Sequence, residues 1–345
     1  MSGELVLSTR RDPDFFALYE MQRGVAECWV YESGGRPSGL GTILVREGWN
    51  EGRPARVGYL GDLRSGFRTS RERGLLRVYG DLLDDAVRRH GCELFVTAVL
   101  ASNTAAIHAL VRRRAARAAQ PRYHLMRRFS MTSIQFTRAV RPRGDRYRVR
   151  VATAADVPAI VALLDRDHRA RPFGYRYDQG EFEHRLECWP GMSLGRTYVA
   201  WDASGQLVGV TSAWDPAAVK RYRVVAYRGS MRWMKLAFNA TCGVLGYPRL
   251  PEPGHDFRCL YLCNTSIQGE RPDVLRALLE RIYGDFRHSG YHFFSLCVYE
   301  NDPLAPALDG FTVRRLDFHL YVVTRSDVEA PNLGAGRPGF EMALA

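Results

Sequence analysis

A short glycine-containing turn is the part of the sequence best suited to bind an anion. Arg71-Glu-Arg-Gly74 follows a predicted strand over residues 55–64 and opens an amphipathic helix over residues 72–90. The first N–H groups of a helix have no partner within it, and the helix dipole favours negative charge there. The turn therefore predicts a cradle for a phosphate group. An ordinary strand–helix turn without a ligand is the alternative interpretation.

The elements around this turn are predicted from hydrophobic spacing. Helix 72–90 carries apolar residues at positions 75, 76, 79, 82, 83, 86 and 87, all on one helical face, and Gly91 stands at its C-cap position. A strand over residues 93–100 and a helix over residues 103–117 follow. The same order of elements recurs near the C-terminus, with a strand over 258–264, a helix over 272–288, a strand over 291–299 and then Asn301.

The chain thus divides into two similar halves. In the first, a hairpin (26–31 and 38–46) precedes the unit, and strands near 123–128 and 130–137 follow it. In the second, a strand (147–151), a helix N-cap region (Thr153–Asp156) and a hairpin (197–201 and 207–212) precede it, and strands over 311–314 and 317–324 follow. We predict domains at 1–138 and 147–326, a linker at 139–146 and a tail at 327–345. The first domain has only residues 1–24 where the second has residues 147–195.

Composition is that of a globular protein with an uneven distribution of charge. The 345 residues contain 49 Lys and Arg, of which only Lys220 and Lys235 are lysines, and the net charge is +12. Residues 104–150 hold 13 arginines against one acid, Asp145, so this segment accounts for the excess. The seven cysteines form no CxxC pair, which favours free thiols and a cytoplasmic location. We expect no metal site, no signal peptide and no transmembrane segment.

These residues resemble the GNAT superfamily of acyl-CoA-dependent N-acyltransferases, in a tandem arrangement. The family signature Arg/Gln-x-x-Gly-x-Gly/Ala is matched by Arg71 and Gly74, whereas Leu76 stands where a small residue is usual. Leu63-Arg-Ser65 stands at the position of the Leu-x-Val strand, and Asn103-Thr-Ala-Ala106 matches the Asn-x-x-Ala that opens the next helix. The resemblance covers both halves, roughly residues 24–137 and 147–324.

The resemblance implies a fold and a cofactor. Each half is expected to be a mixed α/β domain with a mostly antiparallel sheet, a splayed parallel strand pair and flanking helices. It implies acetyl-CoA or another acyl-CoA as cosubstrate, with the pantetheine arm along the central strand and the pyrophosphate on the turn. The residues carried over for this role are Leu63, Arg64, Ser65, Arg71, Glu72, Arg73, Gly74, Leu75, Leu76 and Asn103.

The second copy of the turn is degraded. Gly269 falls too early, Glu270 and Asp273 add negative charge, and Pro272 removes one amide donor. Asn301 keeps the Asn…Ala pattern only faintly. We therefore predict that the second domain binds no CoA and instead shapes the substrate pocket or stabilises the first.

Catalytic residues are less clearly marked. Acyl transfer to an amine needs a base for the ammonium proton, an oxyanion donor and an acid for the leaving thiolate. The resemblance implies a carboxylate on the central strands, where Asp62 and Tyr59 are the nearest ionisable groups, and His108 follows Asn103 on the next helix. The position of the family's tyrosine holds Leu110 or its neighbours, and Tyr123 is a further candidate acid. Each residue also has a purely structural interpretation.

An insertion over residues 214–257 separates two strands of the second half. Residues 216–251 contain seven basic residues and no acid, interleaved with aromatic and aliphatic residues. Such an element can cover a groove, bind an acyl chain or contact a membrane surface, or pack as a helix at the domain interface.

The sequence is compatible with three functions. The first is acetyl transfer from acetyl-CoA to a primary amine on a small molecule or peptide, with CoA bound by the first domain. The second is a catalytically inactive GNAT-like pair that binds acyl-CoA or a partner. The third, nucleic-acid binding by the arginine-rich segment, is disfavoured because that segment offers few aromatic platforms. The acceptor and the oligomeric state are not predicted.

Overall fold

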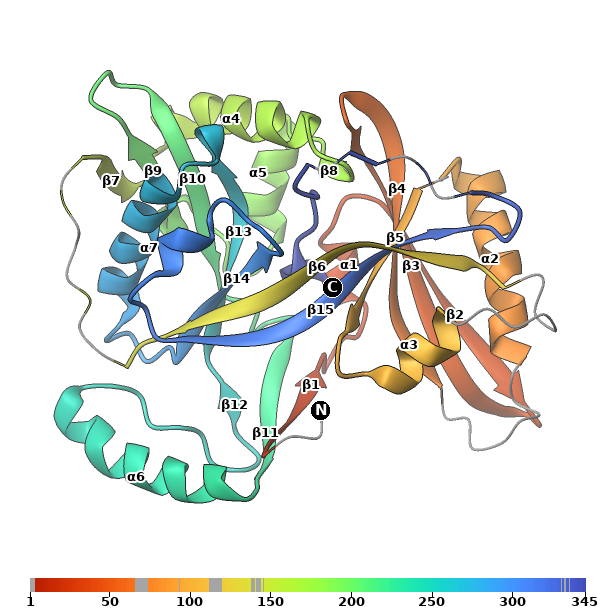
Figure 1. The fold of residues 1–345 in the computed structure, drawn as a ribbon, viewed down its shortest axis with the longest axis horizontal. Helices are drawn as coiled ribbons and strands as arrows, with labels where there is room; N and C mark the ends of the chain where they lie inside the picture. Colours follow the sequence, from red (N-terminus) through yellow and green to blue (C-terminus); the bar gives the residue numbers. More distant parts are fainter. Residues whose placement is uncertain are drawn as a thin grey trace.

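The computed structural model describes residues 4–65, 74–92, 94–111, 120–137, 140, 144, 146–329, 331, 333–334 and 336–345. Within these residues one mixed sheet of 12 strands runs through both halves of the chain (Figure 1). Its main path is β2-β3-β4-β5-β15-β6-β14-β13-β10-β9-β7, and β8 pairs with β3. In this part of the chain two strand pairs, β4–β5 and β13–β14, are parallel and the other pairs are antiparallel. The mixed α/β fold class predicted from the sequence is confirmed.

The first half forms a meander followed by a crossover helix. β2 (Val25–Ser33), β3 (Arg36–Asn50) and β4 (Arg53–Ser65) are antiparallel neighbours, and α2 (Gly74–His90) then returns the chain to β5 (Leu94–Leu100). Gly91 ends α2 as predicted, with φ 61° and its N–H bonded to the carbonyl of Val87. α3 (Thr104–Leu110) follows β5. The predicted helical residues 112–117 lie outside the described part of the chain.

The second half repeats this order with additional helices at its start. In the predicted N-cap region, Thr153 and Asp156 form a capping box, where a single 3-10 turn leads into α4. The elements of this half are β7 (Arg148–Val151), α4 (Val157–Arg169), β8 (Gly174–Tyr175), α5 (Gln179–Cys188), β9 (Thr197–Trp201), β10 (Leu207–Trp214), β13 (Cys259–Ile267), α7 (Pro272–Phe286) and β14 (Phe293–Tyr299).

The two halves exchange their last strands. β15 (Val313–Thr324), from the second half, pairs with β5 of the first half, and β6 (Arg122–Gln135), from the first half, pairs with β14 of the second. β6 and β15 also pair with each other and cross the middle of the molecule side by side (Figure 1). The halves are therefore joined by a continuous hydrogen-bonded sheet, whereas the sequence predicts two separate sheets.

Two sequence predictions about these strands are wrong. The segments predicted as strand pairs, 123–128 with 130–137 and 311–314 with 317–324, each form a single long strand, β6 and β15. Charged residues such as Arg127 and Arg314 interrupt the apolar pattern, but neither is buried, and the backbone pairing continues past them. An exposed arginine on one face of a strand does not interrupt its ladder.

A second, small sheet joins the N-terminus to the insertion. β1 (Leu5–Arg10) pairs with β11 (Arg221–Tyr227), which pairs with β12 (Asp256–Phe257), and α6 (Ser230–Leu245) connects β11 to β12. After β1 the chain forms only the short helix α1 (Ala17–Glu20) before β2. The first half therefore has less helical cover than the second, as predicted. None of the helices in the described part of the chain combines the length and hydropathy needed to cross a bilayer.

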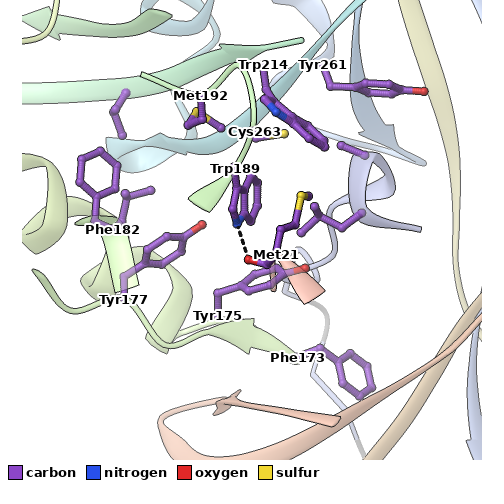
Figure 2. Packing of buried hydrophobic residues seen from close by; sticks show 14 of the residues in the cluster. Met21, Phe173, Tyr175, Tyr177, Phe182, Trp189, Met192, Trp214, Tyr261 and Cys263 are labelled. Atoms are coloured by element: carbon purple, nitrogen blue, oxygen red, sulfur yellow. Dashed lines mark hydrogen bonds between the residues drawn. The ribbon is translucent and has the colours of Figure 1, made fainter. Parts of the chain in front are cut away.

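One of the three hydrophobic clusters of the described residues joins the two halves. It joins Leu18 and Met21 near α1 with the buried faces of α4 and α5, and the C-terminal residues Ala343 and Leu344 are part of it. Figure 2 shows Met21 beside the aromatic residues of the second half, where Trp189 Nε1 donates to the carbonyl of Met21 at 2.9 Å. The predicted tail thus packs between the halves.

Candidate active site

The parallel strands β4 and β5 of the first half separate and leave a slot. They pair with each other only at Val57–Tyr59 opposite Leu94–Val96. Within the described residues β4 runs on to Ser65 beside β3, and β5 runs on to Leu100 beside β15, without further pairing between β4 and β5. Thr97 Oγ1 donates to the carbonyl of Leu60 at 2.7 Å, at the point of separation. Backbone groups along a separated strand edge are available to a ligand that replaces the missing neighbour.

Two helices begin at the open end of this slot. α2 and α3 each follow the carboxyl end of one of the two parallel strands, so their N-termini face the same edge of the sheet. Leu63, Arg64 and Ser65 form the last residues of β4, as predicted. Gly74, Leu75 and Leu76 open α2, and Arg71, Glu72 and Arg73 lie outside the described residues.

Asn103 caps α3 rather than extending into the slot. Its Oδ1 accepts from the N–H of Ala106 at 3.1 Å, and the residue is exposed. This is the local hydrogen bond that an Asn-x-x-Ala sequence favours at a helix start. His108 lies one turn further along α3 with its side chain exposed. The structure does not place His108 beside Asp62, which lies in a partly buried cluster on β4.

Asp62 sits on a bulge in β4 and is held by three donors. Its backbone is in the left-handed region, with φ 46°, and the register between β3 and β4 shifts at this point. Arg11 Nη1 and the Tyr19 hydroxyl each donate to Oδ2 at 2.5 Å, and Arg64 Nη2 donates to Oδ1 at 3.2 Å. Burial opposes ionisation of Asp62, but the charge of Arg11 and the hydrogen bond from Tyr19 outweigh it and lower the carboxyl pKa.

Asn264 occupies the same position in the second half. It also sits on a bulge, with φ 51°, in the equivalent strand β13. Its Oδ1 accepts from the Tyr177 hydroxyl at 3.0 Å and from Arg185 Nη1 at 2.7 Å, as Asp62 accepts from a tyrosine and an arginine. An amide does not take up a proton near neutral pH, so this arrangement of tyrosine, arginine and bulge forms without a base. The similarity between the clusters around Asp62 and Asn264 favours a positioning role for Asp62.

The slot of the second half is occupied by the C-terminal segment. β13 and β14 pair at Cys259–Tyr261 opposite Phe293–Ser295 and then separate. Glu341 Oε1 accepts from the backbone N–H of Asn264 at 2.7 Å. On the other strand, the Tyr299 hydroxyl donates to the carbonyl of Pro338 at 3.4 Å. Residues 338–341 thus bond to both separated strands.

The degraded turn of the second half is closed by side chains. Pro272 takes the first helical position of α7, and Asp273 accepts from the Tyr147 hydroxyl at 2.5 Å and from Arg146 at 3.2 Å. After β14, the Asp302 carboxylate accepts from the N–H groups of Tyr299 at 3.1 Å and Leu304 at 2.9 Å and so closes the turn that follows the strand. Asn301, which precedes Asp302, has its backbone in the left-handed region, with φ 59°.

Tyr59 lies between the first slot and the C-terminal segment. It is the last residue of β4 that pairs with β5, and its ring centroid is 5.8 Å from that of Phe340. A small pocket beside it is lined by Val96, Phe340 and Leu344. Of the predicted catalytic residues, Tyr59 therefore lies nearest to the shared core of the two halves. Tyr123 is buried against Tyr321 on the opposite side, in the cluster under α2.

A larger cavity opens between the halves. It has a volume of about 410 Å³ and is lined by residues of β2, β3 and α5. Gln22, Arg46, Tyr175 and Leu344 line both this cavity and the small pocket at Tyr59. Arg46 donates to the carbonyls of Phe173 at 2.7 Å and Gly174 at 3.1 Å, and its guanidinium carbon lies 3.6 Å from the centroid of the Tyr175 ring. Sequence reasoning did not single out these residues.

The deepest charged side chain near this cavity is Arg185. It is 1% exposed and bonds to Glu181, Glu341 and Asn264. Burial opposes its charge, but the Tyr177 hydroxyl and the two carboxylates outweigh it and raise the pKa of the guanidinium. Glu181 stands four residues before Arg185, and this spacing indicates an ion pair from the sequence alone. The second partner, Glu341 in the C-terminal segment, has no such local pattern.

Comparisons with solved structures identify the fold. A GCN5-related N-acetyltransferase from Sphaerobacter thermophilus superimposes with a TM-score of 0.54 over 90% of this chain and 80% of that chain, at 12% sequence identity. The chain has the tandem GNAT fold. N-myristoyltransferase from Saccharomyces cerevisiae, solved with bound myristoyl-CoA, superimposes with a TM-score of 0.52 over 92% of this chain and 70% of that one, at 11% identity. A tandem GNAT protein from the clavulanic acid biosynthesis pathway gives a TM-score of 0.49 over 89% of this chain and 84% of that chain, at 13% identity.

The sequence itself has no such match. No protein-family model matches it, and no curated protein does. The tandem GNAT fold extends over both halves, in agreement with the resemblance seen in the sequence.

Proposed function

We propose that the protein is an acyl-CoA-dependent N-acyltransferase that binds its cosubstrate in the first half. The observation that carries the proposal is the difference between the two slots. The slot between β4 and β5 opens toward two helix N-termini, whereas that between β13 and β14 is bridged by residues 338–341. An extended thioester arm fits between separated strands, and a pyrophosphate is stabilised by helix N-termini. N-acetyltransferases and N-myristoyltransferase, the latter solved with an acyl-CoA, share the fold.

In this proposal the acceptor amine enters from the inter-half cavity. The cavity and the small pocket beside Tyr59 share lining residues, so the cavity is adjacent to the pocket at the point where β4 and β5 separate. The amine nitrogen attacks the thioester carbonyl, the new amide bond forms, CoA leaves as a thiolate and the ammonium proton is lost. Acetyl-CoA is the simplest donor, and the acceptor is a primary amine on a small molecule or a peptide.

Gly74→Glu tests the position of the cofactor. A carboxylate on the first residue of α2 repels the pyrophosphate and fills the turn, so we expect binding of acyl-CoA to be lost. Thermal unfolding of the wild type with acetyl-, propionyl- and longer acyl-CoAs measures binding. A ligand at 100 times its Kd raises the wild-type Tm by about 4 °C, since it stabilises by about 2.7 kcal/mol.

Gly284→Glu on α7 is the matched control, because it adds the same charge at an exposed glycine with no atom within 4 Å of its Cβ position. We expect the control to keep the full Tm shift. A shift that survived Gly74→Glu would refute the placement of the cofactor in the first half, and no shift with any acyl-CoA would refute the function.

A second candidate function, binding of acyl-CoA without turnover, is favoured by the surroundings of Asp62. Three donors occupy its carboxylate, and Asn264 shows the same network without an ionisable group. Asp62→Asn distinguishes its roles. We expect Asp62 to position β4, and in that case the Asp62→Asn variant acylates a panel of amines at a rate within about threefold of the wild type.

A loss of 100-fold or more in kcat, with the Tm shift by acyl-CoA retained, would instead make Asp62 the general base. Wild-type protein that binds acyl-CoA but acylates no amine in the panel would favour the binding function.

A further inference from the structure

Helix α6 extends away from the rest of the molecule. In Figure 1 it lies at the lower left, joined to the body through β11 and β12. Gly229, with φ 54°, precedes the helix, and Gly246, with φ 69°, ends it. In the described part of the chain it contacts β11, Glu4, the loop that follows it, and His288, whose Nδ1 bonds to the carbonyl of Gly246 at 3.2 Å.

One face of α6 is closed by this loop. Asn239 Nδ2 donates to the carbonyl of Leu250 at 3.2 Å, and its Oδ1 accepts from the N–H of Leu250 at 2.8 Å. Lys235 is buried on the same side, where it pairs with Glu252 and lies over the ring of Tyr227. The loop thus fixes which way the helix faces.

The opposite face is apolar and exposed. Trp233 is 73% exposed and Leu236 is 54% exposed, and Ala237 and Ala240 are also exposed. These four residues stand at i, i+3, i+4 and i+7 and therefore share one helical face. Met234 borders this face. We call Trp233, Met234, Leu236, Ala237 and Ala240 the outer face of α6.

The outer face carries no free hydroxyl. Thr241 follows Ala240 on the same side, and its Oγ1 donates to the carbonyls of Ala237 and Phe238, at 3.2 and 3.0 Å. A hydroxyl that is already hydrogen-bonded within the helix adds little to the free energy of transferring this face from water to an apolar environment.

The charges around the outer face have one sign. Arg228, Arg232 and Arg249 are exposed, and no acidic residue occurs between 216 and 251. The acids nearest in the chain and the fold are already paired: Glu4 accepts from Ser230 at the start of α6, and Glu252 bonds to Lys235. The free charge beside the apolar face is therefore positive.

From this geometry we infer that the outer face of α6 docks on an anionic lipid surface. A helix that presents Trp and Leu beside arginines lies at the boundary between head groups and acyl chains, and arginines near the surface are attracted by anionic lipids. The fixed orientation of α6 directs the apolar residues outward without unfolding of the loop behind it. This inference does not depend on the proposed acyl transfer.

Sedimentation with vesicles tests the inference. We expect the full-length protein to bind phosphatidylcholine vesicles containing 30% phosphatidylserine, to bind pure phosphatidylcholine much more weakly, and to be released as salt rises. Leu236→Ser should weaken binding about tenfold, because a large apolar side chain no longer enters the bilayer. Arg228→Gln with Arg232→Gln should remove most of the preference for phosphatidylserine.

Val30→Ser is the matched control. Val30 is also 54% exposed, but it lies on β2, at one end of the large sheet, whereas the insertion belongs to the small sheet. Vesicle binding should be unchanged by Val30→Ser. Failure of the wild type to bind phosphatidylserine vesicles would overturn the inference. So would a concentration-dependent dimer that Leu236→Ser abolishes while vesicle binding persists, because the outer face would then bind a second copy of the chain.

Discussion

Replacing Arg185 with Met is expected to lower the free energy of unfolding by about 3–5 kcal/mol, as measured by urea denaturation. The side chain is 1% exposed and forms ion pairs with two carboxylates, Glu181 and Glu341, in the shared core. Removal of one member of a buried ionic network leaves the other charges without compensation, and that accounts for the size of the loss. Methionine retains most of the hydrophobic contact with the rings of Tyr175 and Trp189.

Two further variants separate charge from packing. Adding Glu341→Gln to Arg185→Met should restore part of the lost stability, because one unpaired carboxylate is removed. Arg281→Met on α7 is the exposed control. The Arg281 side chain is 45% exposed and pairs with Asp285 at i,i+4. We expect this substitution to lower the free energy of unfolding by about 0.5 kcal/mol. A loss below about 1 kcal/mol for Arg185→Met would show that the network contributes little to stability.

Gly339→Val is expected to release the C-terminal segment from the second slot. A Cβ at this position would lie 2.5 Å from the Cα of Gly174 and 2.8 Å from the carbonyl oxygen of Phe173, and neither backbone atom can move alone. Overpacking of this kind costs about 1–3 kcal/mol, so chymotrypsin cleavage after Phe340 should accelerate about tenfold. Mass spectrometry of the shortened chain measures the rate.

Gly336→Val provides the comparison, because its added Cβ would be 3.6 Å from the nearest atom, Pro172 Cδ, an ordinary contact. The control should be cleaved at the wild-type rate. In Gly339→Val we also expect faster hydrogen exchange at the amide of Asn264, which loses its bond to Glu341. Equal cleavage rates for the two variants would contradict a close fit of the segment against Gly174.

The sequence predicts individual elements well where local patterns decide them. The helical face of α2 and Gly91 at its end, the helix N-cap region at Thr153, and the hairpin of β9 and β10 depend on interactions within a few residues. The two parallel pairs follow from strand–helix–strand units, since a crossover helix returns the chain to the same direction. The candidate slot could therefore be placed between the correct strands.

The exchange of β6 and β15 could not be predicted in this way. Both strands carry apolar residues suited to a sheet interior, and either could pair with the β5 or β14 of its own half. The choice depends on contacts between residues about 200 positions apart, such as Phe318 with Leu100. The segment at Glu341 and the cluster of Arg11 with Asp62 were missed for the same reason, because partners remote in sequence leave no local pattern.

The order in which the strands are synthesised has a consequence for biogenesis. β5 is complete at Leu100, but its native neighbour β15 ends at Thr324. At typical translation rates the ribosome needs roughly 10–45 s to make the intervening 224 residues. During that time β5 lacks its native neighbour, and a strand edge that stays unpaired associates readily with other chains. The protein is therefore expected to depend on chaperones during synthesis, and a fragment ending at residue 138 should aggregate.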